Sequence, residues 1–404
     1  MAANFVDAKW PHAWPKHRKG LAEGLVTVTC ALTSADIDQA DQAPLRAALL
    51  GWAFNTSARR GEPLAAAEPP DDHRHSIAWL RSHLLRLDDV RQPATTRRAL
   101  DALSLRLDGT PASATTVARK RSAFFSVLQY AVELELLDAN PLQSVRWRQP
   151  VRSHVVDRRV VVNPEQARAL LDAVRQDYPS LEAFFACMYY AALRPGEVRH
   201  LRDRDCILPA SGWGELILVG STTSIGRRWT DTGQAQPDRH LKHRATRDTR
   251  PVPASPEFVE TLRRHVVNYP PGVDGRLFVT RTRQGGRPLA GPYGTPVSMG
   301  TVYIVWALAR TTALTPEQVA SPLARRPYDL RHAAVSLWLS ADVPPTQVAE
   351  WAGHSVNVLL RVYAQVLDDR QDDAMARIAR ALEPYGAHER ERQTSRRTAV
   401  QHRP

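Results

Sequence analysis

The C-terminal third of the chain carries three polar motifs separated by helix-breaking residues. The motifs are YDLRHA (Tyr328 to Ala333), WAGHS (Trp351 to Ser355) and LLRVYAQV (Leu359 to Val366). Breaks at Val343-Pro344-Pro345 and at Gly353 divide the helical periodicity that runs from Arg331 to Leu382. The sequence therefore predicts that this region folds as a run of consecutive short helices.

A separate group of helices is predicted earlier in the chain. Apolar residues at helical spacing begin at Ala43 and recur from Ser76 to Leu87, a third helix follows Pro93 and runs through Leu107, and a fourth runs from about Ser113 to Leu137. These four helices predict a small all-α module over residues 43–145. Residues 1–42 show no clear periodicity, so their structure is unclear from the sequence.

A second domain is predicted over residues 163–385. Asn163 can cap its first helix, with Pro164 in the first turn and Gln166 at the capping-box position. The stretch GELILVG (Gly214 to Gly220) has strand character and can pair with TRPVP (Thr249 to Pro253). The expected fold is mainly α with a small antiparallel β-hairpin, in two domains. The last residues, 386–404, form an Arg-rich polar tail that is expected to be disordered.

A basic connector over residues 146–162 joins the two predicted domains. It contains Arg146, Arg148, Arg152, Arg158 and Arg159. An ordinary solvated linker has this composition, and so does a flexible linker between two domains that contact DNA. The sequence leaves both interpretations open.

The charge of the chain indicates a polyanionic partner. Its 404 residues carry a formal net charge of +12. Almost all of this basicity is arginine, and the lysines are Lys9, Lys16, Lys19, Lys120 and Lys242. A GC-rich genome explains such a bias. Even so, a lone lysine in the C-terminal half suggests that Lys242 has a function that arginine cannot perform.

The cysteines and the hydropathy pattern favour a cytoplasmic location. Cys30, Cys187 and Cys206 are odd in number, widely spaced and without the pairing typical of metal sites. A reduced, cytosolic protein fits them better than a disulfide scaffold. The N-terminus lacks a signal-peptide pattern, and no window approaches the roughly 18 consecutive apolar residues of a membrane span.

The order of these motifs resembles the tyrosine recombinase (phage integrase) family over roughly residues 43–385. That family's signature is an arginine at a helix end, a lysine on a hairpin, an H-x-x-R-H box, a G-H box and a nucleophilic tyrosine. The matching residues here are Arg194 in AALRPGEV, Lys242 in LKHRATRDTRPVP, Tyr328 and Arg331 in YDLRHA, His354 in WAGHS, and Tyr363 in LLRVYAQV. Each residue taken alone has an ordinary explanation, such as a core position for Tyr363. The resemblance rests on the complete set in this order.

The resemblance implies DNA cleavage and rejoining through a covalent phosphotyrosine, without metal or nucleotide cofactor. Arg194 and Arg331 would hold the phosphate, because guanidinium groups match its geometry with paired hydrogen bonds. His354 would donate a further hydrogen bond, and Tyr363 would attack. Lys242 would protonate the departing 5′-oxygen. Glu197 either orients this cluster or forms a simple helix ion pair.

The sequence departs from the family pattern at two places. Tyr328 stands where the box usually has histidine, and a phenol cannot serve as a base near neutral pH. A positioning role is therefore expected for Tyr328. The stretch from Arg194 to Lys242 is also longer than in compact members, and residues 221–240 are predicted to be an extended hairpin excursion of unknown purpose.

The resemblance also implies partners. The all-α module would be the family's core DNA-binding domain and would close a C-shaped clamp on double-stranded DNA with the catalytic domain. Arg119, Lys120 and Arg121 are candidates for DNA contacts, although a solvated face is an equal alternative. The helix over residues 372–382 resembles the element that such proteins pack against a neighbouring protomer, as in a homotetramer on DNA. Packing against its own domain is the alternative.

Two other functions remain open from the sequence. A strand-passing topoisomerase would use the same chemistry without site preference. A catalytically silent DNA-binding protein would keep the fold, and Tyr328 motivates that alternative.

Overall fold

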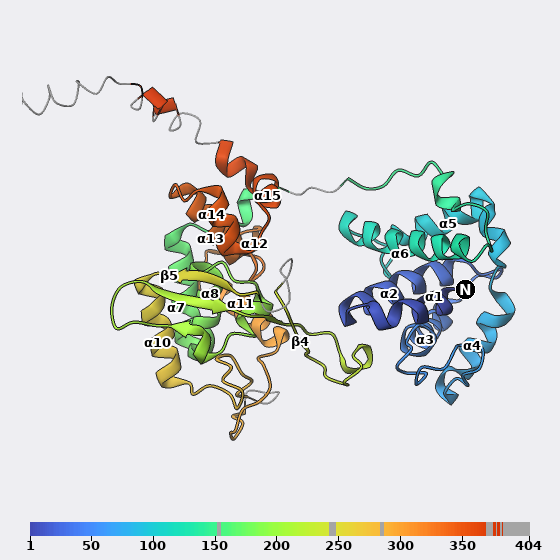
Figure 1. The fold of residues 1–404 in the computed structure, drawn as a ribbon, viewed down its shortest axis with the longest axis horizontal. Coiled ribbons are helices and arrows are strands. Elements are labelled where there is room, and N and C mark those ends of the chain that lie inside the picture. The colour runs from blue at the N-terminus through green and yellow to red at the C-terminus, as the bar shows by residue number, and fades with distance from the viewer. Residues whose placement is uncertain are drawn as a thin grey trace, which may run out of the picture. The chain divides into compact units, whose positions relative to one another are not determined.

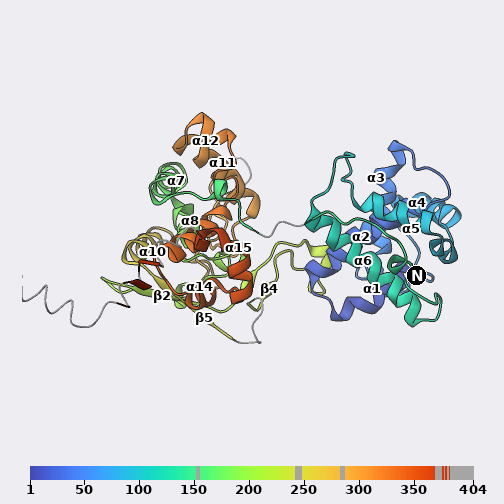
Figure 2. The same ribbon diagram turned by 90° about the horizontal axis from the view of Figure 1, so that it is seen from above.

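The computed structural model describes residues 1–151, 155–241, 248–282, 287–368, 375–376, 378–379 and 382. The chain forms two compact units, shown in Figures 1 and 2. Unit 1 consists of Met1–Ser153 together with Thr222–Arg239, and unit 2 contains the rest. The predicted fold class, mainly α with a small antiparallel sheet, is confirmed.

Unit 1 is all-α at its core. Its main helices are α1 (Ala2–Lys9), α2 (Pro15–Ala31), α3 (Gln39–Ala48), α4 (Asp71–His83), α5 (Pro93–Leu103) and α6 (Ala114–Glu133), with short helical turns η1 (Trp10–His12), η2 (Leu49–Ala53), η3 (Leu87–Arg91) and η4 (Pro141–Gln143). The helices predicted from residue 43 onward correspond to α3 to α6. Ser113 caps α6 by accepting a hydrogen bond from the Thr116 amide.

Residues before 43 are helical and belong to the same core. Helix α2 buries Leu21, Leu25 and Val28 among residues of α5 and α6. Gly24 lies so close to α6 that an added Cβ would stand 3.0 Å from the Ala123 Cβ. The all-α unit therefore begins at Met1 rather than at residue 43, since α1 and α2 complete its interior.

The excursion over residues 222–239 also belongs to unit 1. Strand β3 (Ser221–Thr222) pairs with β4 (Asp238–Arg239), and the short helix η7 (Arg227–Trp229) lies between them. Trp229 is 2 % exposed and packs beside Trp10, with ring centroids 6.0 Å apart. In Figure 2 this yellow-green segment lies among the blue helices. The excursion thus fills part of the core formed by the N-terminal helices.

An ion pair fixes the excursion in place. The Arg18 guanidinium, 5 % exposed, donates two hydrogen bonds of 2.8 Å to the Asp231 carboxylate and a third, 3.2 Å long, to the Trp229 carbonyl. The Trp10 indole also donates to Asp231, at 3.2 Å. The carboxylate therefore compensates a nearly buried cation that lies 213 positions away in the sequence.

Replacing Asp231 with alanine is expected to destabilise unit 1 by about 2 kcal/mol, because Arg18 would keep a buried charge without its carboxylate. Denaturant unfolding followed by tryptophan fluorescence measures this loss. Asp88→Ala removes a carboxylate from an exposed pair with Arg91 and should change stability by less than about 0.5 kcal/mol. Equal effects of the two substitutions would contradict an anchoring role for the excursion.

Unit 2 surrounds a small antiparallel sheet with helices. The helices are α7 (Pro164–Asp177), α8 (Pro179–Tyr190), α9 (Pro195–Val198), α10 (Pro256–Asn268), α11 (Met299–Ala313), α12 (Pro316–Ala320), α13 (Asp329–Ser340), α14 (Pro345–Ala352) and α15 (Val356–Asp368), with short turns η5 (Arg158–Val160) and η6 (Asp203–Asp205). Strands β1 (Cys206–Ile207), β2 (Gly214–Leu218) and β5 (Arg250–Ala254) form the sheet in the order β1-β2-β5. The predicted pairing of β2 with β5 is confirmed.

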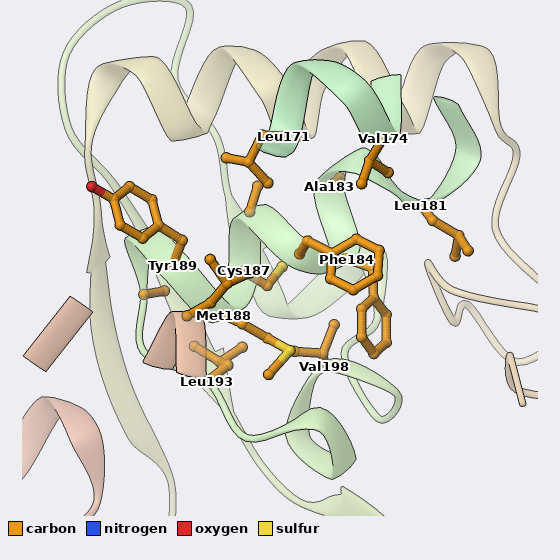
Figure 3. Packing of buried hydrophobic residues seen from close by; sticks show 14 of the residues in the cluster. Leu171, Val174, Leu181, Ala183, Phe184, Cys187, Met188, Tyr189, Leu193 and Val198 are labelled. Atoms are coloured by element: carbon orange, nitrogen blue, oxygen red, sulfur yellow. The ribbon is translucent and has the colours of Figure 1, made fainter. Parts of the chain in front are cut away.

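Helix α8 is the centre of the unit 2 core. Phe184, Phe185 and Met188 on α8 are fully buried, and Figure 3 shows the Met188 side chain reaching toward Val198. The predicted capping box at α7 is present, since Asn163 and Gln166 exchange side-chain-to-backbone hydrogen bonds of 2.8 and 3.0 Å. The buried helix α8 leads directly into the loop that carries Arg194.

Helices α13, α14 and α15 form the predicted run of short helices. A small separate apolar cluster joins them through Val335, Val348 and Leu359. Helix α14 ends at Gly353, whose φ of 63° is left-handed and so favours glycine. This end of the molecule holds the three polar motifs together.

Candidate active site

Arg194 lies at the start of α9, directly after the loop that leaves α8. Its guanidinium donates to Glu197 Oε1 at 2.8 Å and to the Gly353 carbonyl at 2.7 Å. Burial opposes its charge, but the neighbouring Glu197 and Tyr328 outweigh that effect and raise the pKa of Arg194. The side chain therefore remains a fixed cation beside the WAGHS motif.

Glu197 is a buried carboxylate between arginines. It is 2 % exposed, and besides Arg194 it accepts hydrogen bonds of 2.8 and 3.1 Å from Arg250 on β5. Burial alone would raise its pKa, but Arg250, Arg194 and Arg331 lower the pKa of Glu197 to about 2. Glu197 therefore forms the helix ion pair with Arg194 and a second ion pair with Arg250.

Arg331 on α13 is fully buried, and its guanidinium lies beside His354. Its guanidinium donates to the carbonyls of Ala192 and Ala352, and its Nη2 lies 2.8 Å from His354 Nε2. Burial and the nearby Arg194 lower the pKa of Arg331 to about 10, so it stays charged at neutral pH. Its Nε is buried without a hydrogen-bond partner among the described residues.

Gly353 is required by space as well as by its backbone conformation. An added Cβ would stand 2.0 Å from an Arg250 guanidinium nitrogen and 3.2 Å from one of Arg194. The glycine of the WAGHS motif thus lets the chain pass directly against two arginines. The following residue, His354, is thereby brought beside Arg331.

His354 is a neutral hydrogen-bond donor in this pocket. Burial, followed by the charges of Arg331 and Arg194, lowers the pKa of His354 to about 3. Because Arg331 donates to Nε2, the ring proton must be on Nδ1. This Nδ1 is buried, and within the described residues nothing accepts from it. Nδ1 can therefore donate a hydrogen bond to an oxygen of a bound anion.

Tyr363 lies on α15 with its ring in the apolar cluster and its hydroxyl directed at α13. It is 1 % exposed, and its backbone leaves helical geometry at φ −115° and ψ 21°. The hydroxyl lies 2.9 Å from Nδ1 of His332. Burial raises the pKa of Tyr363 above its ordinary value, even though Arg331 and Arg194 oppose this shift. The phenol is therefore neutral in the DNA-free protein.

Tyr328 completes the ring of polar groups. It is half-buried at the start of α13, and the Arg331 guanidinium carbon lies 6.0 Å from its ring centroid. Its ring also lies edge-on to His332, with centroids 5.2 Å apart. The structure thus brings Arg194, Tyr328, Arg331, His354 and Tyr363 together. Lys242 lies outside the described residues.

The DNA-contact candidates on α6 face different neighbours. Arg119 forms an exposed 3.0 Å ion pair with Glu23, and Lys120 Nζ donates to the Thr27 hydroxyl at 3.3 Å. Arg121 is half-buried. Successive helical residues point about 100° apart, so these side chains do not form one stripe.

Lys120 lines a basic pocket of about 410 Å³ in unit 1. The other basic residues of its wall are Arg46, Arg98 and Arg106. Burial, with the charges of Arg46 and Arg119, lowers the pKa of Lys120. A wall of this charge favours an anionic occupant.

The sequence prediction did not identify two residues of this cluster. Arg250 was only part of the hairpin motif, although an arginine on the same strand face as buried Val252 signals a buried carboxylate partner. His332 was not among the candidates either, although it directly follows Arg331 in YDLRHA. Its contact with Tyr363 depends on how α13 packs against α15.

Other classes of site are not found in the part of the chain that the structure describes. No group of His, Cys, Asp and Glu residues there could hold a metal ion. No helix there has the length and apolar character of a membrane span.

Solved structures show that the chain has the fold of the tyrosine recombinases. The Tn1549 transposon integrase (aa 82-397) in complex with transposon right end DNA is 17 % identical, with a TM-score of 0.51 over 78 % of this chain and 95 % of that one. The same integrase with a circular intermediate DNA is 16 % identical, with a TM-score of 0.50 over 72 % and 88 %. XerH site-specific recombinase bound to difH substrate is 14 % identical, with a TM-score of 0.47 over 89 % and 95 %. No family model and no curated protein sequence matches the chain.

Proposed function

We propose that this protein is a site-specific DNA recombinase or integrase that cleaves and rejoins strands through a 3′-phosphotyrosyl intermediate at Tyr363. The observation that carries this proposal is the convergence of Arg194, Arg331 and His354 beside the Tyr363 pocket. The buried cluster holds three arginines, including Arg250, against the single carboxylate of Glu197. This excess of positive charge suits a phosphodiester, whose attack builds negative charge on the non-bridging oxygens.

The unfilled hydrogen-bond donors support the same chemistry. Nε of Arg331 and Nδ1 of His354 are buried donors without acceptors in the described part of the chain. Buried polar groups are nearly always paired in native proteins, so such groups indicate where a ligand binds. An oxygen of a bound phosphate would satisfy such a donor. Because a phosphotyrosine stores the energy of the broken bond, rejoining needs no ATP.

Tyr363 is almost fully covered, so the groups over its hydroxyl must move aside before a phosphate can reach the oxygen. DNA binding would then combine two events, filling of the arginine cluster and release of the nucleophile.

Lys242 is proposed as the acid that protonates the departing 5′-oxygen. Lys242→Ala is expected to slow cleavage of a normal phosphodiester by roughly 10²-fold, the usual effect of losing a positioned acid. A 5′-phosphorothiolate substrate has a leaving group that departs without protonation, so it should restore most of the rate. Single-turnover cleavage of the two substrates measures the difference. Equal slowing on both substrates would assign Lys242 to DNA binding instead.

DNA binding outside the active site is proposed for unit 1. The candidates are Arg119, Lys120 and Arg121. Of these, Lys120 lines the basic pocket, whose positive charge favours an anion. Both units would then grip duplex DNA in a C-shaped clamp. The phosphate contacts should make affinity fall steeply as salt rises.

Assembly into a homotetramer on DNA is also proposed. Met375, Ile378 and Leu382 are 60 %, 58 % and 76 % exposed, which favours packing against a neighbouring protomer over packing on their own domain. Exposed apolar residues at helical spacing are typical of an interface.

Mapping of covalent adducts on genomic DNA tests the proposed function. Recombinase function predicts adducts at one recurring sequence and no relaxation of plasmids that lack it. A topoisomerase would relax every supercoiled plasmid, and a silent DNA-binding protein would form no adduct.

A further inference from the structure

His332 is positioned at the reacting atom of the proposed cleavage. It follows Arg331 on α13, and its Nδ1 lies 2.9 Å from the Tyr363 hydroxyl. The two rings are tilted with centroids 5.9 Å apart, and Tyr328 meets the imidazole edge-on, with centroids 5.2 Å apart. These two ring contacts hold the imidazole in place beside the hydroxyl.

The charged and titratable groups around His332 keep its ring neutral. Arg331 and Arg326 lie on or just before its own helix, His354 follows α14, and Tyr328 and Tyr363 contact its ring. Burial, followed by the two arginine charges, lowers the pKa of His332 to about 4. A neutral imidazole has a free lone pair at one nitrogen. In the tautomer with its proton on Nε2, His332 accepts the hydrogen bond of the neutral Tyr363 hydroxyl at Nδ1.

The other bases near Tyr363 are already engaged. His354 uses its Nε2 lone pair to accept from Arg331, and its Nδ1 then carries the ring proton. Both carboxylate oxygens of Glu197 already accept hydrogen bonds from Arg194 and Arg250. Tyr328 is a phenol at the box position where histidine is usual. Among the described residues this leaves His332 as the base within hydrogen-bond distance of the hydroxyl.

We propose that His332 is a catalytic residue, the general base that takes the proton of Tyr363 during cleavage and returns it during rejoining. This role rests on the proposed function. In cleavage the O–H proton of Tyr363 moves to Nδ1, the phenolic oxygen forms a bond to phosphorus, and the bond from phosphorus to the 5′-oxygen breaks. The departing oxygen takes its proton from the acid, proposed to be Lys242. In rejoining each of these transfers runs in reverse.

Two substitutions separate proton transfer from positioning. His332→Asn keeps a hydrogen-bonding atom near the position of Nδ1 but cannot accept a proton, and His332→Ala removes both. Both variants are expected to bind DNA like the wild type and to form the Tyr363 adduct about 10²- to 10⁴-fold more slowly. Added imidazole should partly restore His332→Ala, because it can enter the space left by the ring. His265→Asn is the matched control, since His265 is buried with a pKa of about 4 on α10, away from this site.

The dependence of the cleavage rate on pH gives the decisive measurement. In the wild type, neutral His332 is the competent form, so the rate should be flat near neutral pH and fall only as pH drops through its low pKa. Without a base, the rate of His332→Ala should follow the tyrosinate fraction and rise about tenfold per pH unit below the pKa of Tyr363. His265→Asn should keep the wild-type profile.

Three results would overturn the role of His332. The first is a wild-type cleavage rate in His332→Asn. The second is a faster cleavage rate in either variant, which would mean that His332 holds Tyr363 in a resting position. The third is a cleavage rate of His332→Ala that does not change with pH. Failure of the proposed function would look different, since the wild type itself would then form no adduct at Tyr363.

Discussion

Replacing Tyr363 with phenylalanine is expected to abolish formation of the covalent protein–DNA complex. The substitution removes one oxygen and keeps a ring that packs among Ala334, Val335 and Leu359. The loss should therefore be chemical, with folding and DNA affinity close to those of the wild type. The substrate is a nicked duplex containing the site found by adduct mapping, which traps the intermediate because the nicked fragment diffuses away. Denaturing gels reveal the adduct as a band of reduced mobility.

A second tyrosine provides the matched control. Tyr303 lies on α11 and is 49 % exposed, so Tyr303→Phe should form the adduct at the wild-type rate. Peptide mapping of the wild-type adduct should place the DNA on Tyr363. An adduct that persists in Tyr363→Phe, or one that maps to another tyrosine, would refute the active-site assignment even if the protein cleaves DNA.

Local signals in the sequence were sufficient for much of unit 2. The capping box at Asn163 predicted the start of α7, since it depends only on residues three positions apart. The prolines before α14 and the glycine after it divided the last helices correctly. These features are set by backbone conformation, which neighbouring residues determine.

The N-terminal helices lacked such signals. Three basic residues, Lys16, Arg18 and Lys19, interrupt the apolar pattern of α2. Arg18 is buried between Trp10 and two residues of the distant excursion, Trp229 and Asp231. No local pattern encodes a contact across 213 positions. The purpose of the excursion was unclear for the same reason, because its partners are the helices that could not be placed.

The active site, likewise, was predicted only in part from the sequence. Motif order placed Arg194, Arg331, His354 and Tyr363 on a list of candidates, and the structure brings them together. The contact of His332 with Tyr363 depends on the packing of α13 against α15, which sequence spacing does not specify. Arg250 faces Glu197 for the same reason, since β5 and α9 meet only in the folded chain.

Replacing Glu197 with glutamine is expected to cost unit 2 about 3–5 kcal/mol of stability, the usual effect of removing one partner from a buried ion pair. Glutamine has nearly the same shape, so the loss would come from charge. Arg250, 1 % exposed, and Arg331, fully buried, would then lie beside Arg194 without a compensating carboxylate. Urea unfolding at neutral pH measures the loss. Glu182→Gln breaks the more exposed pair with Arg264 and should cost at most about 1 kcal/mol.

The loss caused by Glu197→Gln should depend on pH in a way that identifies the carboxylate. Folding lowers the pKa of Glu197 from its ordinary value of 4.5 to about 2. Its ionised form therefore contributes stability above pH 4.5, about 3 kcal/mol from this shift, and that contribution disappears as pH falls through about 2. The stability difference between wild type and Glu197→Gln should be constant above pH 5 and narrow below it.

The double variant Glu197→Gln/Arg250→Met should recover part of the loss, because it also removes the uncompensated cation. If the difference does not change between pH 5 and the lowest pH at which the protein folds, the buried charge is not what Glu197 contributes.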